Sequence, residues 1–220
     1  MAKAQSPAFD LNTYTALNKV EAYELVLMFS HFAEVMAKHS IEWWATCGTM
    51  LGALRCGGLI KWDDDVDVAL NQEDYEKMKS VRKELEGSKY RMKFVGQYGK
   101  LQHKGFIDDT NEASIWIDIF KTENGIYPQK HCQICNAPDD MRLPLRKVNY
   151  SGIQINIPNQ AEILCDLQFT GWRSKAEVYN HRGKKKKKVK GVEIWADFGG
   201  HQHLGTHLLT DEANIPYVHI

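Results

Sequence analysis

Apolar residues recur at intervals of three and four positions near the start of the chain and predict an amphipathic helix within residues 11–39. The stripe that this spacing produces consists of Leu25, Met28, Phe29, Phe32 and Met36. Asp10 or Asn12 is expected to cap the helix, because a short side-chain acceptor satisfies its first free amide protons. One face of this helix should therefore lie against the core.

Short apolar runs bounded by glycine and polar residues predict strands after this helix. Residues 41–47 predict a buried strand that ends before Gly48, and residues 66–70, where valine alternates with aspartate, predict a second one. Residues 90–95 and 99–106 are expected to form a pair of strands. Residues 114–120 alternate enough to be a further strand, with Asp118 as its one carboxylate.

Two helical segments are expected between these strands. Residues 49–55 have room for one or two helical turns, which Gly57 and Gly58 would close. Asn71, followed three residues later by Asp74, resembles a helix start. The apolar face of that second helix continues through Tyr75, Met78, Val81 and Leu85. This alternation of strands and helices favours a mixed α/β domain with a small sheet.

The composition is that of an ordinary globular domain, with 43% hydrophobic residues in a chain of 220. Lys plus Arg and Asp plus Glu each total 28, so the net charge is zero and we expect no nucleic-acid partner. No apolar stretch approaches the length of a transmembrane helix, and residues 1–11 lack a hydrophobic signal core. Five cysteines are too few for a disulfide scaffold. We therefore expect a cytoplasmic protein.

An acidic run at residues 63–67 holds the first candidate chemistry. On a strand, residues two apart share a face, so Asp65 and Asp67 project together while the valines between and after them enter the core. Two such carboxylates suit Mg²⁺, a hard cation that prefers oxygen ligands. A solvated acidic loop is the alternative. A calcium loop is excluded, because Val68 and Asp74 stand where its glycine and its glutamate belong.

Two further features would complete such a site. Gly48-Thr49 begins a helix with exposed backbone amides and a hydroxyl, which suit phosphate oxygens, although a simple helix cap is the alternative. Asp118 supplies a third carboxylate from a separate strand. A buried charge needs a partner, and a metal ion would be one.

The order of these features resembles the LicD family of the nucleotidyltransferase fold, which includes bacterial phosphocholine transferases, fukutin and the fukutin-related protein. The resemblance rests on Gly48-Thr-Met-Leu-Gly-Ala-Leu-Arg55, Gly58-Leu-Ile-Lys-Trp-Asp-Asp-Asp-Val-Asp67 and Asp118-Ile-Phe120. Cys56 stands where the family often has His, and Lys61 where it tends to have Pro. The match weakens after residue 121. The resemblance implies a small mixed sheet flanked by helices.

The family also implies an activity and roles for these residues. It implies transfer of a phospho-alcohol group from a CDP-activated donor to a glycan hydroxyl, with release of CMP. The metal would be Mg²⁺, or Mn²⁺ in its place, and its expected ligands, which are also the expected catalytic residues, are Asp65, Asp67 and Asp118. The expected substrate-binding residues are Gly48, Thr49, Arg55 and Trp62. Asp63 and Asp64 are expected either just behind the metal ligands or in the loop.

The resemblance also suggests how the chain is organised. We expect a helical lead-in over residues 1–40, a nucleotidyltransferase-like catalytic core over 41–122 and a C-terminal extension over 123–220. In the extension, residues 124–143 are rich in turns, residues 153–157 predict a strand and residues 159–169 a helix. The basic run 182–190 is either a solvated loop or a contact for anionic lipid, nucleic acid or phosphorylated glycan.

Several alternatives remain at this point. His131, Cys132 and Cys135 form one compact ligand cluster, but a single CxxC is a weak zinc signal, so we expect a free thiol pair instead of a structural zinc. The acceptor glycan would be met at a membrane face by peripheral contact. A nucleotide-sugar glycosyltransferase also uses an Asp-x-Asp metal site. A non-catalytic glycan- or nucleotide-binding protein of the same fold is the remaining alternative.

Overall fold

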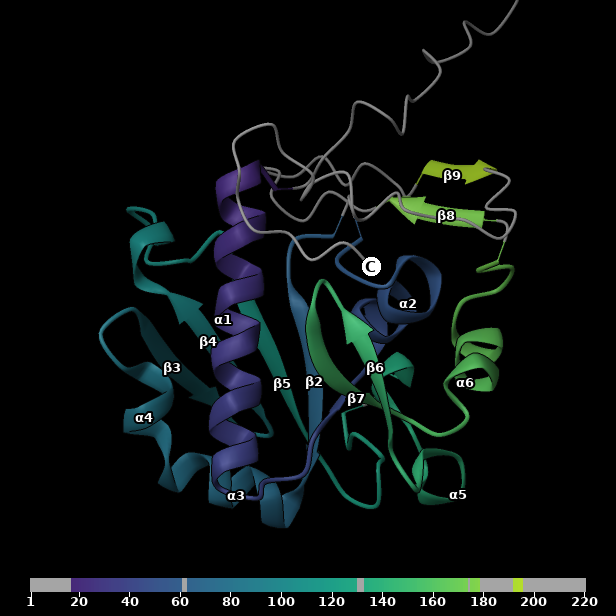
Figure 1. Cartoon of the computed structure of the whole chain (residues 1–220), viewed down its shortest axis with the longest axis horizontal. Coiled ribbons are helices and arrows are strands. Elements are labelled where there is room, and N and C mark those ends of the chain that lie inside the picture. Colours follow the sequence, from purple (N-terminus) through teal and green to yellow (C-terminus); the bar gives the residue numbers. More distant parts are fainter. Residues whose placement is uncertain (1–16, 61–62, 130–132, 174, 179–191, 196–220) are drawn as a thin grey trace, which may run out of the picture.

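A five-stranded mixed sheet forms the centre of the computed structural model (Figure 1). The structure describes residues 17–60, 63–129, 133–173, 175–178 and 192–195. In spatial order the strands are β1 (Trp44–Ala45), β2 (Val66–Asn71), β5 (Trp116–Thr122), β4 (Tyr98–His103) and β3 (Tyr90–Val95). Strands β2 and β5 pair in parallel, and the other neighbours pair antiparallel. The predicted mixed α/β domain with a small sheet is confirmed.

Helix α1 (Lys19–Lys38) covers one face of this sheet (Figure 1). All five residues of the predicted apolar stripe are buried, as the spacing required. The predicted cap is wrong. The helix begins at Lys19, and Asn18 caps it by accepting a hydrogen bond from the Glu21 amide, while the Glu21 carboxylate accepts one from the Asn18 amide. Asp10 and Asn12 lie outside the described residues.

The first predicted strand is much shorter than residues 41–47. Trp44 and Ala45 are the residues of this strand that pair with β2. The Thr46 amide still donates to the Asp67 carbonyl of β2, and the strand stops because the chain then turns into a helix. Cys47 takes a positive φ of 47° at that turn. The strand predicted at 114–120 is observed two residues later, at Trp116–Thr122.

Three helices follow the order that the sequence predicted. Helix α2 (Cys47–Cys56) ends at Gly57, which adopts the left-handed conformation that favours glycine. Helices α3 (Gln72–Ser80) and α4 (Arg82–Glu86) form the predicted second segment, which breaks at Val81. Asn71 precedes α3 without capping it, since its side-chain oxygen accepts from the Thr122 hydroxyl and the Gly125 amide instead.

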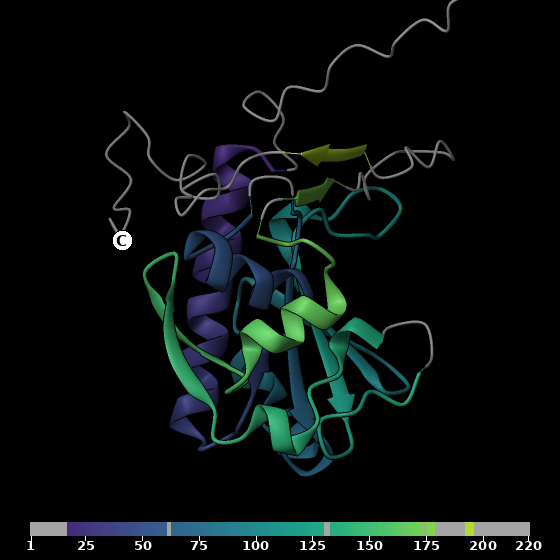
Figure 2. The same ribbon diagram turned by 90° about the vertical axis from the view of Figure 1, so that its right-hand side faces the viewer.

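The later part of the chain packs beside α2. A hairpin joins β6 (Arg146–Tyr150), which the sequence did not predict, to β7 (Ile153–Ile157), which it did. Figure 2 shows helix α6 (Ala161–Gln168) lying against α2. The remaining elements are η1 (Lys104–Phe106), η2 (Gln133–Cys135), α5 (Asp139–Arg142), β8 (Lys175–Val178) and β9 (Val192–Trp195). Among the described residues, no helix is both long and apolar enough to cross a membrane.

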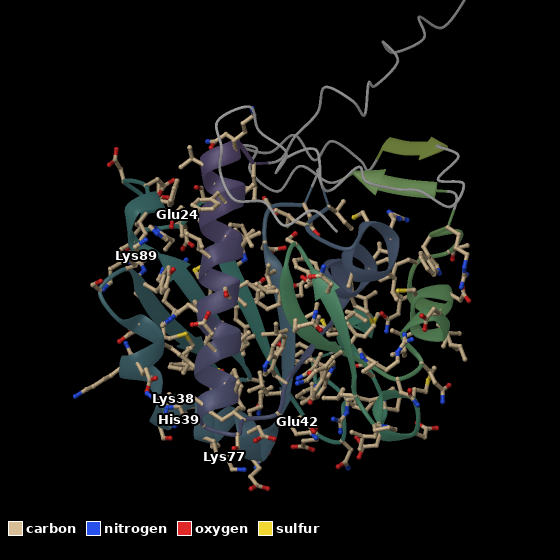
Figure 3. The ribbon with its side chains drawn as sticks, viewed as in Figure 1. Glu24, Lys38, His39, Glu42, Lys77 and Lys89 are labelled. Atoms are coloured by element: carbon tan, nitrogen blue, oxygen red, sulfur yellow. The ribbon has the colours of Figure 1, made fainter. Side chains whose placement is uncertain are left out.

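Polar contacts join the edges of this arrangement. In Figure 3, Lys38 and His39 lie at the C-terminal end of α1, where both side chains contact Glu84 of α4 at 2.7 and 2.9 Å. Arg142 of α5 is 1% exposed and lies with its guanidinium 4.4 Å from the centre of the Trp44 ring. Its nitrogens pair with Glu42 at 3.0 Å and Asp139 at 2.7 Å, so one buried cation holds α5 against β1.

Candidate functional site

Sheet register brings the predicted carboxylates together. Strands β2 and β5 are parallel neighbours, and Asp67 stands directly opposite Asp118. Asp65 precedes β2 by one residue and faces the same way as Asp67. One oxygen from each of Asp65, Asp67 and Asp118 lies within 4.8 Å of the others. The three residues that the sequence proposed as metal ligands therefore form one cluster at the start of β2.

The N-terminus of α2 holds this cluster in place. The Asp67 amide donates a hydrogen bond to the Thr49 hydroxyl oxygen at 2.7 Å, and the Gly48 amide donates to the Asp67 side chain. Thr49 is 1% exposed. Both residues were predicted to bind phosphate oxygens, and the structure places them against Asp67. Their observed contacts organise Asp67.

Asp63 adjoins this cluster through Asp65, and the sequence predicted it either just behind the ligands or in the loop. One oxygen from each of Asp63, Asp64 and Asp65 lies within 4.8 Å of the others, so Asp65 is shared by two acidic groups. A Cβ atom added at Gly48 would lie only 2.4 Å from Oδ2 of Asp63. Glycine at position 48 thus leaves the space that the Asp63 carboxylate fills.

These carboxylates strongly perturb one another. Burial raises the pKa of Asp65 and of Asp67 well above the ordinary range, and the neighbouring carboxylates raise both further. Burial and the charge of Asp64 raise the pKa of Asp63 to about 7. Burial also raises the pKa of Asp118, while Lys100 and Tyr98 oppose that rise. The cluster needs positive charge before all its members ionise.

Strand β4 contributes two residues that the sequence analysis missed. Lys100 stands opposite Asp118 in the register, and its ammonium lies 3.4 Å from Asp118 Oδ1. The Tyr98 hydroxyl donates a hydrogen bond to the same oxygen. Tyr98 and Lys100 are two apart on a predicted strand and so share a face, but only the pairing of β4 with β5 shows which carboxylate they meet.

The residues present fit a divalent cation of the Mg²⁺ type. The cluster offers only carboxylate oxygens, which are the ligands that Mg²⁺ prefers. Asp65 is 9% exposed, and the side chain of Asp118 is 15% exposed. Burying several carboxylates so close together is costly without a cation between them. Asp65, Asp67 and Asp118 are therefore the residues that would hold such an ion.

Arg55, another predicted substrate-binding residue, contacts a different part of the chain. The Arg55 guanidinium donates to the backbone carbonyl of Trp172, with Nε at 3.1 Å, and so ties α2 to the segment after α6. Trp62 lies outside the described residues, as does the basic run at 182–190.

The cysteines also differ from the prediction. Cys135 is fully buried and disulfide-bonded, whereas the sequence predicted a free thiol there. The Cys47 thiol donates a hydrogen bond to the Cys135 sulfur at 3.2 Å. His131 and Cys132 lie outside the described residues.

The chain is similar in sequence to several known proteins. The chain is 24% identical over 169 residues to an uncharacterized protein of Rickettsia typhi, covering 74% of this chain and 51% of that protein. It is 24% identical over 146 residues to the ribitol 5-phosphate transferase FKRP of Mus musculus, and this match covers 61% of this chain and 29% of that protein. A shorter match, 32% identical over 54 residues, covers 24% of this chain and 20% of the lipopolysaccharide cholinephosphotransferase LicD of Haemophilus influenzae.

These relatives are longer than the matched region, and the chain spans about half or less of their length. Residues 40–160, more than half of the chain, match the family described as "LicD/FKTN/FKRP, nucleotidyltransferase domain". That segment contains α2, β2, β4 and β5, and with them every carboxylate of the cluster. The chain therefore belongs to the LicD family and carries its nucleotidyltransferase domain.

Proposed function

We propose that this protein is a Mg²⁺-dependent transferase that moves a phospho-alcohol group from a CDP-activated donor to a glycan hydroxyl and releases CMP. The observation that carries the proposal is the convergence of Asp65, Asp67 and Asp118 in a chain of the LicD family. The relatives add support, since one is named a ribitol 5-phosphate transferase and another a lipopolysaccharide cholinephosphotransferase.

The proposed reaction joins an acceptor oxygen to the phosphorus that bears the alcohol. The bond from that phosphorus to the bridging oxygen breaks, and CMP leaves with the bridging oxygen. Bound Mg²⁺ would neutralise charge on the diphosphate. Asp118, at the edge of the cluster beside Tyr98 and Lys100, would orient the attacking hydroxyl and accept its proton. The cluster would thus supply the metal ligands and the group that accepts the proton.

The α2 N-terminus would serve the same reaction from the other side. Gly48 and Thr49 hold Asp67 through the amide and the hydroxyl oxygen described above. We propose that the remaining hydrogen-bonding capacity at this helix start meets a phosphate oxygen of the donor, because helix N-termini favour anions.

The experiment compares wild type with Asp67→Asn, which keeps the shape of the side chain and removes its charge. Binding of CDP-choline, CDP-ribitol, CDP-glycerol and UDP-sugars is measured by calorimetry with Mg²⁺ and again with EDTA. CMP release in the presence of candidate glycans follows. Asp109→Asn is the matched control, because Asp109 is exposed and lies outside the cluster.

We expect one CDP-alcohol to bind in the presence of Mg²⁺ and to lose that binding with EDTA or Asp67→Asn. Binding of UDP-sugars alone, with release of a nucleoside diphosphate, would replace this proposal with a glycosyltransferase. Donor binding without turnover for any glycan would favour a non-catalytic binding protein. If wild type binds none of these donors, the proposal is refuted.

A further inference from the structure

Lys100 ends a row of charged side chains that crosses three strands. Asp67 on β2 stands opposite Asp118 on β5, and Asp118 stands opposite Lys100 on β4. Register partners on neighbouring strands share a face of the sheet, so the lysine points to the same side as both aspartates. The row therefore sets one cation beside the proposed metal ligands.

The contact between Lys100 and Asp118 is loose for an ion pair. Its 3.4 Å separation exceeds the roughly 2.7–2.9 Å of a well-formed charged hydrogen bond. The ammonium instead lies 4.1 Å from the centre of the Trp116 ring and 5.8 Å from that of Tyr98, and the side chain is 22% exposed. Two aromatic rings thus support the cation at a point that solvent reaches.

Negative charges outnumber positive charges around the acidic cluster. Asp63 and Asp65 lie beside Asp67 and Asp118 in the acidic cluster. Among the described residues, an ion pair joins Lys100 to Asp118 of this cluster. A divalent cation bound by Asp118 would compete with the ammonium for the same carboxylate, since both are attracted to it. Metal binding therefore weakens the hold of Asp118 on Lys100.

We propose that Lys100 is a counter-ion that changes partners, pairing with Asp118 before metal binds and then contacting the donor phosphate that bears the alcohol. This inference rests on the proposed function, because it assumes a diphosphate donor at the acidic cluster. The rings of Trp116 and Tyr98 hold the ammonium near the site in both situations. An ammonium is a compact point charge and suits a phosphate oxygen.

The proposal predicts effects of opposite sign for Lys100→Met. Mn²⁺ alone, followed by electron paramagnetic resonance, should bind about fivefold more tightly, since a competing cation is removed. CDP, measured by calorimetry at saturating Mn²⁺, should bind about tenfold more weakly, because its second phosphate loses a charged partner. CMP, which lacks that phosphate, should bind as it does to wild type.

Two further variants separate this role from a structural one. Lys100→Arg keeps the charge and should bind Mn²⁺ and CDP within about threefold of wild type. Lys121→Met is the matched control, because Lys121 also pairs with a carboxylate, Glu76 at 3.1 Å, and lies over a tyrosine ring, but outside the cluster. Lys121→Met should change neither the Mn²⁺ affinity nor the CDP affinity. Thermal unfolding of each variant identifies any loss of the fold.

Weaker Mn²⁺ binding by Lys100→Met, or unchanged CDP binding, would overturn the inference. If Lys100→Met does not fold, the Lys100→Arg protein still tests the proposal, since a loss of CDP binding there with an intact fold also contradicts a charge-based role. Failure of the proposed function is a different result. In that case wild type itself binds no CDP, and Asp67→Asn binds Mn²⁺ as wild type does.

Discussion

Replacing Gly48 with alanine tests the packing of the acidic cluster by adding one methyl group. The new Cβ would lie 2.4 Å from Asp63 Oδ2, 3.4 Å from Asp63 Cγ and 3.7 Å from Asp67 Oδ2. Only the first of these distances is shorter than an ordinary contact. The substitution therefore presses on a single atom, the nearer oxygen of Asp63.

The size of the effect follows from these distances. An ordinary carbon–oxygen contact is roughly 3.4 Å, so the Asp63 oxygen must move by about 1 Å. Overpacking of this kind costs about 1–3 kcal/mol. Alanine in a helix interior is worth about 1 kcal/mol more than glycine, and Gly48 lies in the first turn of α2, where this gain is at most about 1 kcal/mol. We expect a net loss of about 1 kcal/mol in unfolding free energy, with weaker binding of Mn²⁺.

A double-mutant cycle isolates the steric cause. Asp63→Ala removes the atoms that the new methyl group would strike, and no other atom lies within 3.4 Å of the added Cβ. In the Asp63→Ala background, Gly48→Ala should therefore become neutral or stabilising, by up to about 1 kcal/mol. Urea unfolding of the four proteins measures the cycle, and Mn²⁺ titration of each follows the site.

Two results would refute this reasoning. If Gly48→Ala unfolds at the same urea concentration as wild type and keeps its Mn²⁺ affinity, Asp63 does not fill this space. Equal destabilisation in both backgrounds would mean that the cost arises from the helix backbone and not from the carboxylate.

Three other changes test the fold and its electrostatics. Without metal, urea unfolding should show lower stability near pH 8 than near pH 5. Burial raises the pKa of Asp63 from 3.8 to about 7, so between these values the native state binds more protons than the unfolded state, and its stability falls as pH rises. Equal stability at both pH values contradicts a raised pKa for Asp63. Arg142→Met should cost about 2 kcal/mol, since it removes the buried guanidinium that pairs with Glu42 and Asp139. An unchanged unfolding midpoint argues against that role. Gly125→Ala should cost more than about 3 kcal/mol, because φ is 76° and the new Cβ would lie 1.8 Å from a carbonyl oxygen. Gly96→Ala, with φ of 60° and no neighbour within 4 Å, should cost only about 1 kcal/mol and is its control.

Local patterns in the sequence predicted the elements that the structure contains. The three-and-four spacing of apolar residues identified the buried face of α1, and Gly57 marked the end of α2. Alternation along residues 66–70 placed Asp67 on the opposite face from its valine neighbours. These predictions succeed because the side-chain period of a helix or strand is set by its own backbone. The predicted cap of α1 was wrong although its signal, Asn18 followed three residues later by Glu21, is local to the sequence. The predicted length of β1 was wrong because strand pairing depends on contacts with a distant segment.

Only the tertiary structure decided which strands are neighbours in the sheet. Asp67 and Asp118 are 51 positions apart, and they meet because β2 and β5 pair in parallel at that register. Lys100 joins them because β4 pairs with the other edge of β5. Asp63 completes the cluster because the loop before β2 turns back against Gly48. Strand pairing and loop closure depend on packing between distant segments, which periodicity along the chain does not encode.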